Sequence, residues 1–388
     1  MRSAVSALLL AAGAVALLAQ ACGSDETTAS CGGVELIAAA SDYSQNGAAI
    51  CAAPGGCARG ADLGGDPMLT VSNGRAFFLA RENDLVFEVH PTCGYAFAQR
   101  SLTSLAPVDP TTGARRPANP HDVAAAPDGT LVVPLYDTPK IAFFGPGDAK
   151  PTAIDISAQD PDGNPQADAV SIVHVGGVPK AFVTLERLDD NAKLLSKQPS
   201  QMLRIDVATR SIEAVIELEG RNPFNPMSEL DGALFMAEPG NFDAADEDLA
   251  GIERFDTATS TSRLILRERD LRGSVAEVAV TRGCGAAIVA GPEVDVNPTW
   301  LVTFDPETGE IFSSKESPAL GPTPGYDLQG LAWRGDQLYV GDRRRGAGGF
   351  PVHVLARKDG CTLAETGRTI ELPQRPVALR PAHQFHPR

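Results

Sequence analysis

A unit of paired strands recurs along the chain at steps of about fifty residues. Each unit opens with an apolar run, which is followed by a turn and a second apolar run. The clearest copy extends from Asn119 through the turn Pro127-Asp128-Gly129 to Val133. Seven inner strands are expected to start at Pro67, Pro120, Ala169, Pro226, Ala276, Leu328 and Pro376. A long period made of short strands is typical of a propeller or a solenoid.

The second half of each unit repeats as well. An apolar strand leads into an acidic turn and then into another strand, as at Asp206–Thr209, Asp256–Thr259 and Asp305–Thr308. Asp and Thr side chains can bond to their own backbone in such turns. Four strands joined by tight turns form one propeller blade. The repeat therefore favours one long all-β domain over several smaller ones.

These motifs resemble those of the YVTN/NHL-type β-propellers. The resemblance lies in Asn119-Pro120-His121-Asp122-Val123-Ala124, in Leu338-Tyr339-Val340 and in the acidic turns, and it covers about residues 34–380. Many members of this group are bacterial lipoproteins outside the cytoplasm. The resemblance implies blades and an extracytoplasmic location, and it implies no particular activity.

The two ends of the repeat region predict how the ring closes. Six complete units lie between Pro67 and Leu372. The apolar runs 34–40 and 47–50 lack an inner partner, whereas Arg375–Leu379 is an inner strand without followers. Pairing them would make a seventh blade and remove the open sheet edges. We expect a seven-bladed all-β propeller over 34–380, followed by a tail over 381–388.

Residues 1–21 have the composition of an export signal. Arg2 is the only charged residue, and the stretch from Ala4 to Leu18 is apolar but shorter than a confident membrane span. Leu18-Ala19-Gln20-Ala21-Cys22 resembles a bacterial lipobox, in which Cys22 would carry the lipid. Ala19-Gln20-Ala21 also fits ordinary signal cleavage, so simple secretion is the alternative.

Residues 22–33 then read as a short polar tether. Gly23, rather than Asp, follows the cysteine, and in Gram-negative bacteria this pattern implies the outer membrane. The expected location is therefore extracytoplasmic, with the protein anchored to the outer membrane through its N-terminal lipid.

Cysteine usage agrees with an oxidising compartment. Of seven cysteines, six remain if Cys22 is lipidated, which is the even number that disulfides require. We expect a bridge between Cys284 and Cys361, which fall in turns on the same side of neighbouring blades. The other four are expected to pair locally around the closing and first blades: Cys31, Cys51, Cys57 and Cys93.

Charge excludes one class of partner. The net charge is −16, so the surface repels the phosphates of nucleic acids. We expect a monomer that holds a protein, peptide or glycan, and no nucleic acid.

Candidate ligand residues follow from the propeller scheme, because such sites usually sit at the channel mouth where inner strands begin. The strand starts contribute His121, Asp122, Asp168, Asn225, Glu277 and Asp327. Loops between second and third strands contribute Asp137, Arg187, Asp189, Glu238, Glu293, Asp342 and Arg343. A ring of carboxylates and amides could hold calcium through oxygen ligands, although ordinary capping residues around a wet channel would look the same.

The segment Asp160–Asp168 also spaces carboxylates and an Asn around a Gly, as calcium loops do, but it lacks the terminal Glu of an EF-hand. A blade-connecting turn is the other interpretation. No nucleophile elbow, H-E-x-x-H motif or phosphate-binding loop occurs in the sequence. The expected function is a non-catalytic binding or scaffolding module without a resident cofactor. The alternative is a metal-dependent hydrolase resembling the propeller lactonases, with its site in the central channel.

Overall fold

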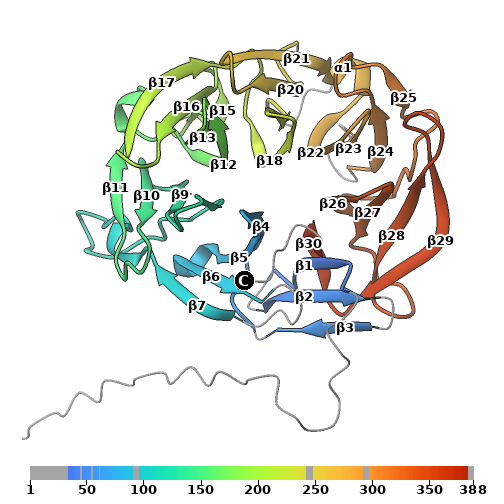
Figure 1. Ribbon diagram of the computed structural model, residues 1–388, viewed down its shortest axis with the longest axis horizontal. Helices are drawn as coiled ribbons and strands as arrows, with labels where there is room; N and C mark the ends of the chain where they lie inside the picture. Colours follow the sequence, from blue (N-terminus) through green and yellow to red (C-terminus); the bar gives the residue numbers. More distant parts are fainter. Residues whose placement is uncertain are drawn as a thin grey trace, which may run out of the picture. The chain divides into compact units, whose positions relative to one another are not determined.

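Seven four-stranded antiparallel sheets are arranged in a ring around a central channel in the computed structural model (Figure 1). The structure describes residues 34–43, 46–53, 56–60, 62–90, 96–241, 248–291 and 297–382. The expected seven-bladed β-propeller is confirmed. The expected signal and tether, with Cys22 and Cys31, lie outside the described residues, as do Cys93 and Glu293.

Blades 1 to 6 follow the chain, and the first strand of each lies nearest the channel, whereas the last strand, β30, takes this place in blade 7 (Figure 1). Blade 1 contains β4 (Pro67–Ser72), β5 (Arg75–Ala80), β6 (Leu85–Val89) and β7 (Ala96–Ser101). Blade 2 contains β8 (Ala124–Ala125), β9 (Leu131–Leu135), β10 (Lys140–Phe144) and β11 (Thr152–Asp155). Blade 3 contains β12 (Ala167–Val175), β13 (Val178–Leu185), β16 (Gln201–Asp206) and β17 (Ser211–Glu217).

Blade 4 contains β18 (Phe224–Leu230), β19 (Ala233–Glu238), β20 (Gly251–Asp256) and β21 (Thr261–Arg267). Blade 5 contains β22 (Ser274–Thr281), β23 (Cys284–Ala290), β24 (Thr299–Phe304) and β25 (Ile311–Ser313). Blade 6 contains β26 (Leu328–Arg334), β27 (Gln337–Asp342), β28 (Phe350–Arg357) and β29 (Leu363–Leu372). Blade 7 is formed by β30 (Arg375–Pro381), β1 (Leu36–Ser41), β2 (Gly47–Ala53) and β3 (Gly56–Arg59).

The remaining elements are short. A two-stranded sheet joins β14 (Leu188–Asp189) to β15 (Leu195–Ser196), beside blade 3. The helices are η1 (Arg81–Asn83), η2 (Thr103–Leu105), η3 (Ser157–Gln159) and α1 (Glu268–Leu271). Within the described part of the chain, no helix has the length and apolar character needed to cross a membrane.

The repeated acidic turns take the conformation that their side chains favour. The carboxylate of Asp206 accepts the backbone N–H of Thr209 at 2.8 Å. Asp256 and Asp305 accept the N–H groups of Thr259 and Thr308 at 2.8 and 2.9 Å. Each Asp therefore satisfies backbone donors that the turn would otherwise leave unpaired, and this explains why the motif recurs at the same place in three blades.

The core lies between the blades. All six residues of β19 are buried, because this strand is covered by blades on both sides. The outer strand β17 alternates exposed and half-buried residues. Phe235 of blade 4 and Trp300 of blade 5 belong to one buried cluster, as expected when adjacent blades pack face to face. Each large apolar side chain buried in this way contributes about 1.5–3 kcal/mol.

The ring closes by pairing the two ends of the propeller. β1 lies antiparallel to β30, with Leu36 opposite Pro381 and Ser41 opposite Arg375. In Figure 1 the red strand β30 therefore completes a blade whose other strands are blue. The closure expected from the unpartnered apolar runs is confirmed. Hydrogen bonds hold β30 to β1, and thereby to the rest of blade 7.

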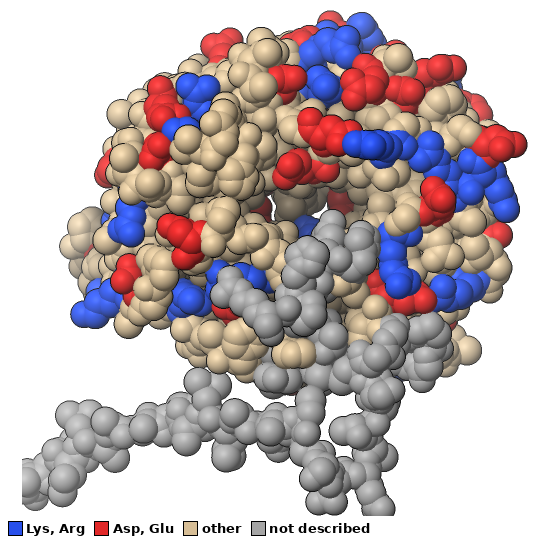
Figure 2. Space-filling view, in the orientation of Figure 1, with Lys and Arg blue, Asp and Glu red and all other residues tan. Residues whose placement is uncertain are grey.

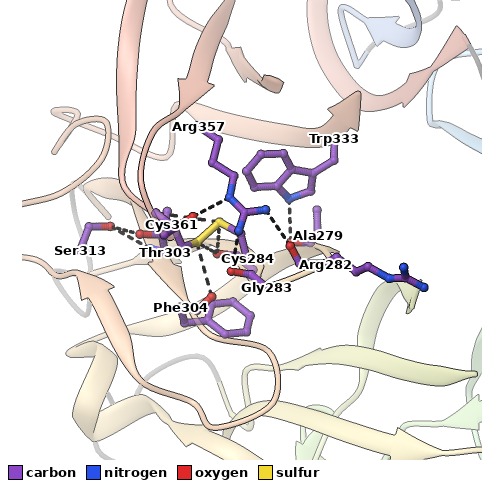
Figure 3. Close-up of a disulfide and its surroundings, with 12 residues drawn as sticks. Ala279, Arg282, Gly283, Cys284, Thr303, Phe304, Ser313, Trp333, Arg357 and Cys361 are labelled. Atoms are coloured by element: carbon purple, nitrogen blue, oxygen red, sulfur yellow. Dashed lines mark hydrogen bonds between the residues drawn. A yellow bond between two sulfur atoms is a disulfide. The ribbon is translucent and has the colours of Figure 1, made fainter. Parts of the chain in front are cut away.

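A disulfide joins blade 5 to blade 6. Cys284 and Cys361 are bonded, and their Cα atoms are 5.0 Å apart (Figure 3). Arg357 donates hydrogen bonds across the same junction to the carbonyls of Arg282 and Gly283, at 2.7 and 3.1 Å. The expected bridge is therefore present. Cys51 lies buried in β2, and nothing is described of the side chain of Cys57 in β3.

Candidate functional site

Two cavities occupy the central channel, which opens through the middle of the ring (Figure 2). The turn-side cavity, of about 530 Å³, lies where the first hairpins turn, and Asn73 and Gly335 line its rim. The mouth cavity, of about 240 Å³, lies where inner strands begin, and Pro67 and Leu328 line it. Glu277 and Arg380 line both cavities, so the channel has a charged waist between them.

Two carboxylates that line the channel serve as clamps between blades. Both oxygens of Asp122 accept backbone N–H groups, and one of these belongs to Val170 of blade 3, at 2.9 Å. Both oxygens of Glu277 accept N–H groups of blade 6, including that of Leu331 at 3.0 Å. Burial raises the pKa of Asp122 to about 6 and also raises the pKa of Glu277. These acids are therefore engaged in holding adjacent inner strands together.

His121 pairs with Asp168 and not with its sequence neighbour Asp122. The Nδ1 of His121 lies 2.5 Å from Asp168 Oδ1, and its ring stacks on Tyr136 with centroids 4.1 Å apart. The Nε2 contacts the guanidinium of Arg81. Burial lowers the pKa of His121, so the neutral ring donates to Asp168 and accepts from Arg81.

The chain of contacts continues into blade 3. The hydroxyl of Tyr136 donates to Glu186 at 2.8 Å, and burial raises the pKa of Glu186 well above its usual range. Among the described residues, one oxygen of Asp168 and one of Glu186 have no hydrogen-bond partner. His121 is only 8% exposed, and neither His121 nor Asp168 lines a channel cavity. The group is a buried polar network beside the channel, connected to the mouth cavity through Arg81.

The remaining two strand-start candidates are engaged locally. Asn225 lines the mouth cavity, and its amide donates to the carbonyl of Ala276 at 2.8 Å. Asp327 accepts the N–H of Gly325 at 3.1 Å and lies 3.8 Å from the guanidinium of Arg344. The six candidates thus do not converge. Across the described residues, no three His, Cys, Asp or Glu side chains are grouped as a metal would require.

The calcium-like segment Asp160–Asp168 is already filled by protein donors. Asp160 accepts the Nε of Arg187 at 3.2 Å, and Asp162 accepts the N–H of Asp190 at 2.9 Å. Arg187 thus lies where a cation would have to be placed. Because calcium needs six to eight oxygen ligands, these residues do not fit a calcium site.

The mouth cavity is lined by candidate side chains that sequence patterns do not identify. Tyr43, Tyr326, Gln329 and Arg380 line it together with Arg343, which the loop positions had suggested. The guanidinium of Arg343 lies 4.9 Å from the ring centroid of Tyr43, whose hydroxyl donates to Gln329 at 3.2 Å. Tyr326 directly precedes the candidate residue Asp327, and this position was the one signal for it in the sequence. Tyr43 and Arg380 come from blade 7, whose contribution depends on ring closure.

Comparison with solved structures supports the fold. A candidate 6-phosphogluconolactonase from Bacteroides fragilis has a TM-score of 0.57 at 11% identity, covering 92% of this chain and 99% of that one. A candidate 6-phosphogluconolactonase from Bacteroides uniformis has a TM-score of 0.54 at 13% identity, covering 89% and 99%. The dihydro-heme d1 dehydrogenase NirN has a TM-score of 0.54 at 12% identity, covering 91% and 76%.

At these identities the likeness shows a β-propeller with repeated blades and nothing finer. No protein-family model matches the chain, and no curated protein matches its sequence.

Proposed function

We propose that this protein is a lipid-anchored, extracytoplasmic propeller of the YVTN/NHL type that binds a ligand without transforming it. The anchor is supported by the apolar stretch that leads into Cys22 and by the polar tether after it. An oxidising location is supported by the Cys284–Cys361 bridge. The ligand site in this proposal is the mouth cavity.

The observation that carries the proposal is the convergence of polar and aromatic side chains from separate blades on one small cavity. Tyr43 comes from blade 7, Arg81 follows β5 of blade 1, and Asn225 belongs to β18 of blade 4. Blade 6 supplies Tyr326 and Arg343. Concave sites with a few convergent polar groups on a rigid scaffold are the usual form of a ligand site. The volume of the mouth cavity, about 240 Å³, suits a compact group such as one end of a peptide or glycan.

The alternative function is metal-dependent hydrolysis of a lactone in the channel, which the resemblance to propeller lactonases suggests. Its metal ligands would have to come from the strand-start acids. Asp122 and Glu277 have both oxygens engaged by backbone N–H groups, and Arg380 lies beside them. This donor set does not fit a metal ion, so binding without turnover is the better-supported function.

The binding proposal is tested by filling the mouth cavity. Gln329→Trp places an indole there, whereas Gln99→Trp places one on the exposed outer strand of blade 1. Short peptides, glycan fragments and small metabolites are screened by thermal shift against both variants and the wild type. We expect hits that Gln329→Trp abolishes and Gln99→Trp retains. Hits that both variants retain would place the ligand elsewhere, and turnover of lactones or esters would contradict a non-catalytic role.

The anchor is tested separately. Full-length protein expressed in a Gram-negative host should partition into detergent and carry a lipid on Cys22, as detected by mass spectrometry of its N-terminal peptide. Cys22→Ser should partition into the aqueous phase. An unmodified N-terminus in the wild type would instead indicate simple secretion.

A further inference from the structure

Two arginines at the mouth cavity have no carboxylate partner among the described residues. The guanidinium of Arg343 packs over Tyr43, and its charge is not paired there. Arg380 donates to the carbonyl of Leu379 at 2.7 Å and makes no ion pair. The third arginine that lines the cavity, Arg81, is by contrast paired with Asp66 at 3.5 Å. The mouth cavity thus contains two guanidinium groups that form no ion pair among the described residues.

No described carboxylate lies within ion-pair distance of Arg343, whereas Arg380 is attracted by the nearby Glu277 and Asp122. Asp66 is used by Arg81, and the oxygens of Glu277 accept backbone N–H groups of blade 6. Asp327 accepts a turn N–H and faces Arg344. Arg343 therefore contributes a positive charge to the mouth cavity that no ion pair among the described residues neutralises.

The cavity also holds Arg343 in place before any ligand arrives. Stacking over the Tyr43 ring limits the motion of the guanidinium, and the hydroxyl of Tyr43 is in turn held by Gln329. Tyr326 lines the same cavity, together with apolar residues such as Met68 and Phe224. A preorganised guanidinium beside aromatic and apolar walls suits a planar oxyanion on a compact apolar body.

We propose that the mouth cavity recognises a small organic oxyanion, a carboxylate or phosphate group that Arg343 and Arg380 bind between the rings of Tyr43 and Tyr326. This inference rests on the proposed binding function and names the class of ligand. Arg supplies paired N–H donors that match the two oxygens of such a group.

The test uses matched probes on the full-length protein. Benzoate and phenyl phosphate represent the two oxyanions, inorganic phosphate lacks the apolar body, and benzyl alcohol and benzylamine are neutral and cationic analogues. Binding is measured by calorimetry for the wild type, Arg343→Gln, Arg343→Lys and the exposed control Arg116→Gln. We expect Arg343→Gln to weaken binding of an anionic probe by about tenfold or more, and Arg343→Lys to weaken it less. Arg116→Gln should bind as the wild type does.

Chemical modification gives a second readout. Phenylglyoxal should modify Arg343, and the anionic probes should protect it, while modification of Arg116 stays unchanged. The difference between benzoate and phenyl phosphate shows which oxyanion is preferred. Equal binding of benzyl alcohol or benzylamine, unchanged affinity in Arg343→Gln, or no binding of any anionic probe at millimolar concentration would overturn the inference.

Failure of the inference can be told apart from failure of the binding proposal. If neutral ligands bind and Gln329→Trp abolishes their binding, the mouth cavity is a ligand site and only the oxyanion class is wrong. If ligands bind but none responds to Gln329→Trp, the ligand site lies elsewhere, and if no ligand of any class binds, the binding function itself fails.

Discussion

The hydroxyl of Tyr339 donates a 2.9 Å hydrogen bond to the carboxylate of Glu35, which lies 304 residues earlier in the chain. The same carboxylate contacts the guanidinium of Arg368 and lies 3.5 Å from that of Arg334. Glu35 directly precedes β1 of blade 7, and its three partners belong to blade 6. This cluster therefore holds the segment just before β1 of blade 7 against blade 6, and we call it the latch.

Removal of the latch should destabilise the ring. Glu35→Ala removes the carboxylate that Tyr339, Arg334 and Arg368 share. Because both arginines are about one-third exposed, we expect a loss of about 2 kcal/mol in the free energy of unfolding. Urea denaturation measures this loss, with Glu217→Ala on the exposed edge of β17 as the control. Equal effects of the two substitutions would show that the latch contributes nothing.

Deletion of residues 373–388 should lower the melting temperature by about 10 °C or more, because it removes β30 and reopens blade 7. The buried side chains of Val377 and Leu379 go with it. Deletion of 383–388 alone keeps all of β30 and serves as the control in thermal melts. A melt that is unchanged by the longer deletion is incompatible with closure through β30.

Loss of the disulfide should cost about 4 kcal/mol, since the bridge closes a loop of 77 residues in the unfolded chain. The double variant Cys284→Ala, Cys361→Ala is compared with the wild type by denaturation under non-reducing conditions. Peptide mapping without reductant should recover the two cysteines in one linked fragment. Recovery of either cysteine linked to another partner would contradict this pairing.

Glu238 should make stability depend on pH. Burial, and then the nearby Glu253, raise the pKa of Glu238 well above its ordinary value of 4.5. The folded state favours the protonated form of Glu238. Its contribution to the free energy of unfolding is therefore complete below pH 4.5 and is lost as the pH rises through the raised pKa of the folded state. Glu238→Gln should therefore be more stable than the wild type at pH 8, with a smaller difference at pH 5.

Denaturation at both pH values measures the effect, and Glu217→Gln is the exposed control. The prediction fails if Glu238→Gln and the wild type lose stability in parallel between pH 5 and pH 8.

Calcium should change thermal stability by less than about 1 °C, because Asp160 and Asp162 are occupied by Arg187 and by backbone donors. Melts in 5 mM calcium and in EDTA provide the comparison, and magnesium controls for ionic strength. A large shift specific to calcium would mean that the segment Asp160–Asp168 rearranges to release its carboxylates.

Local patterns were sufficient to predict the blades. The strand starts expected at Pro67 and Leu328 coincide with the first residues of β4 and β26. The turn at Asp256 forms the bonds that its residue types favour. Alternation and turn chemistry act over a few residues, so they can be recognised in the sequence itself.

Site residues were predicted less well, because their partners come from other blades. His121 was not expected to form a dyad with Asp122, and the structure shows instead a bond to Asp168, 47 residues later. Asp122 and Glu277 looked like ligands in the sequence, but they are engaged by the N–H groups of neighbouring blades. A carboxylate at a strand start has the same local sequence pattern whether it binds a ligand or accepts hydrogen bonds from a neighbouring blade.

By itself, the sequence determined the blade repeat, the closing pair of strands and the cysteine pair that bridges blades 5 and 6. All of these follow from periodic patterns and from the order of the units along the chain. Only the tertiary structure decided which charges remain unpaired at the mouth cavity. Arg343 and Arg380 belong to different blades, and whether a charge meets a partner depends on distances through space that no local pattern records.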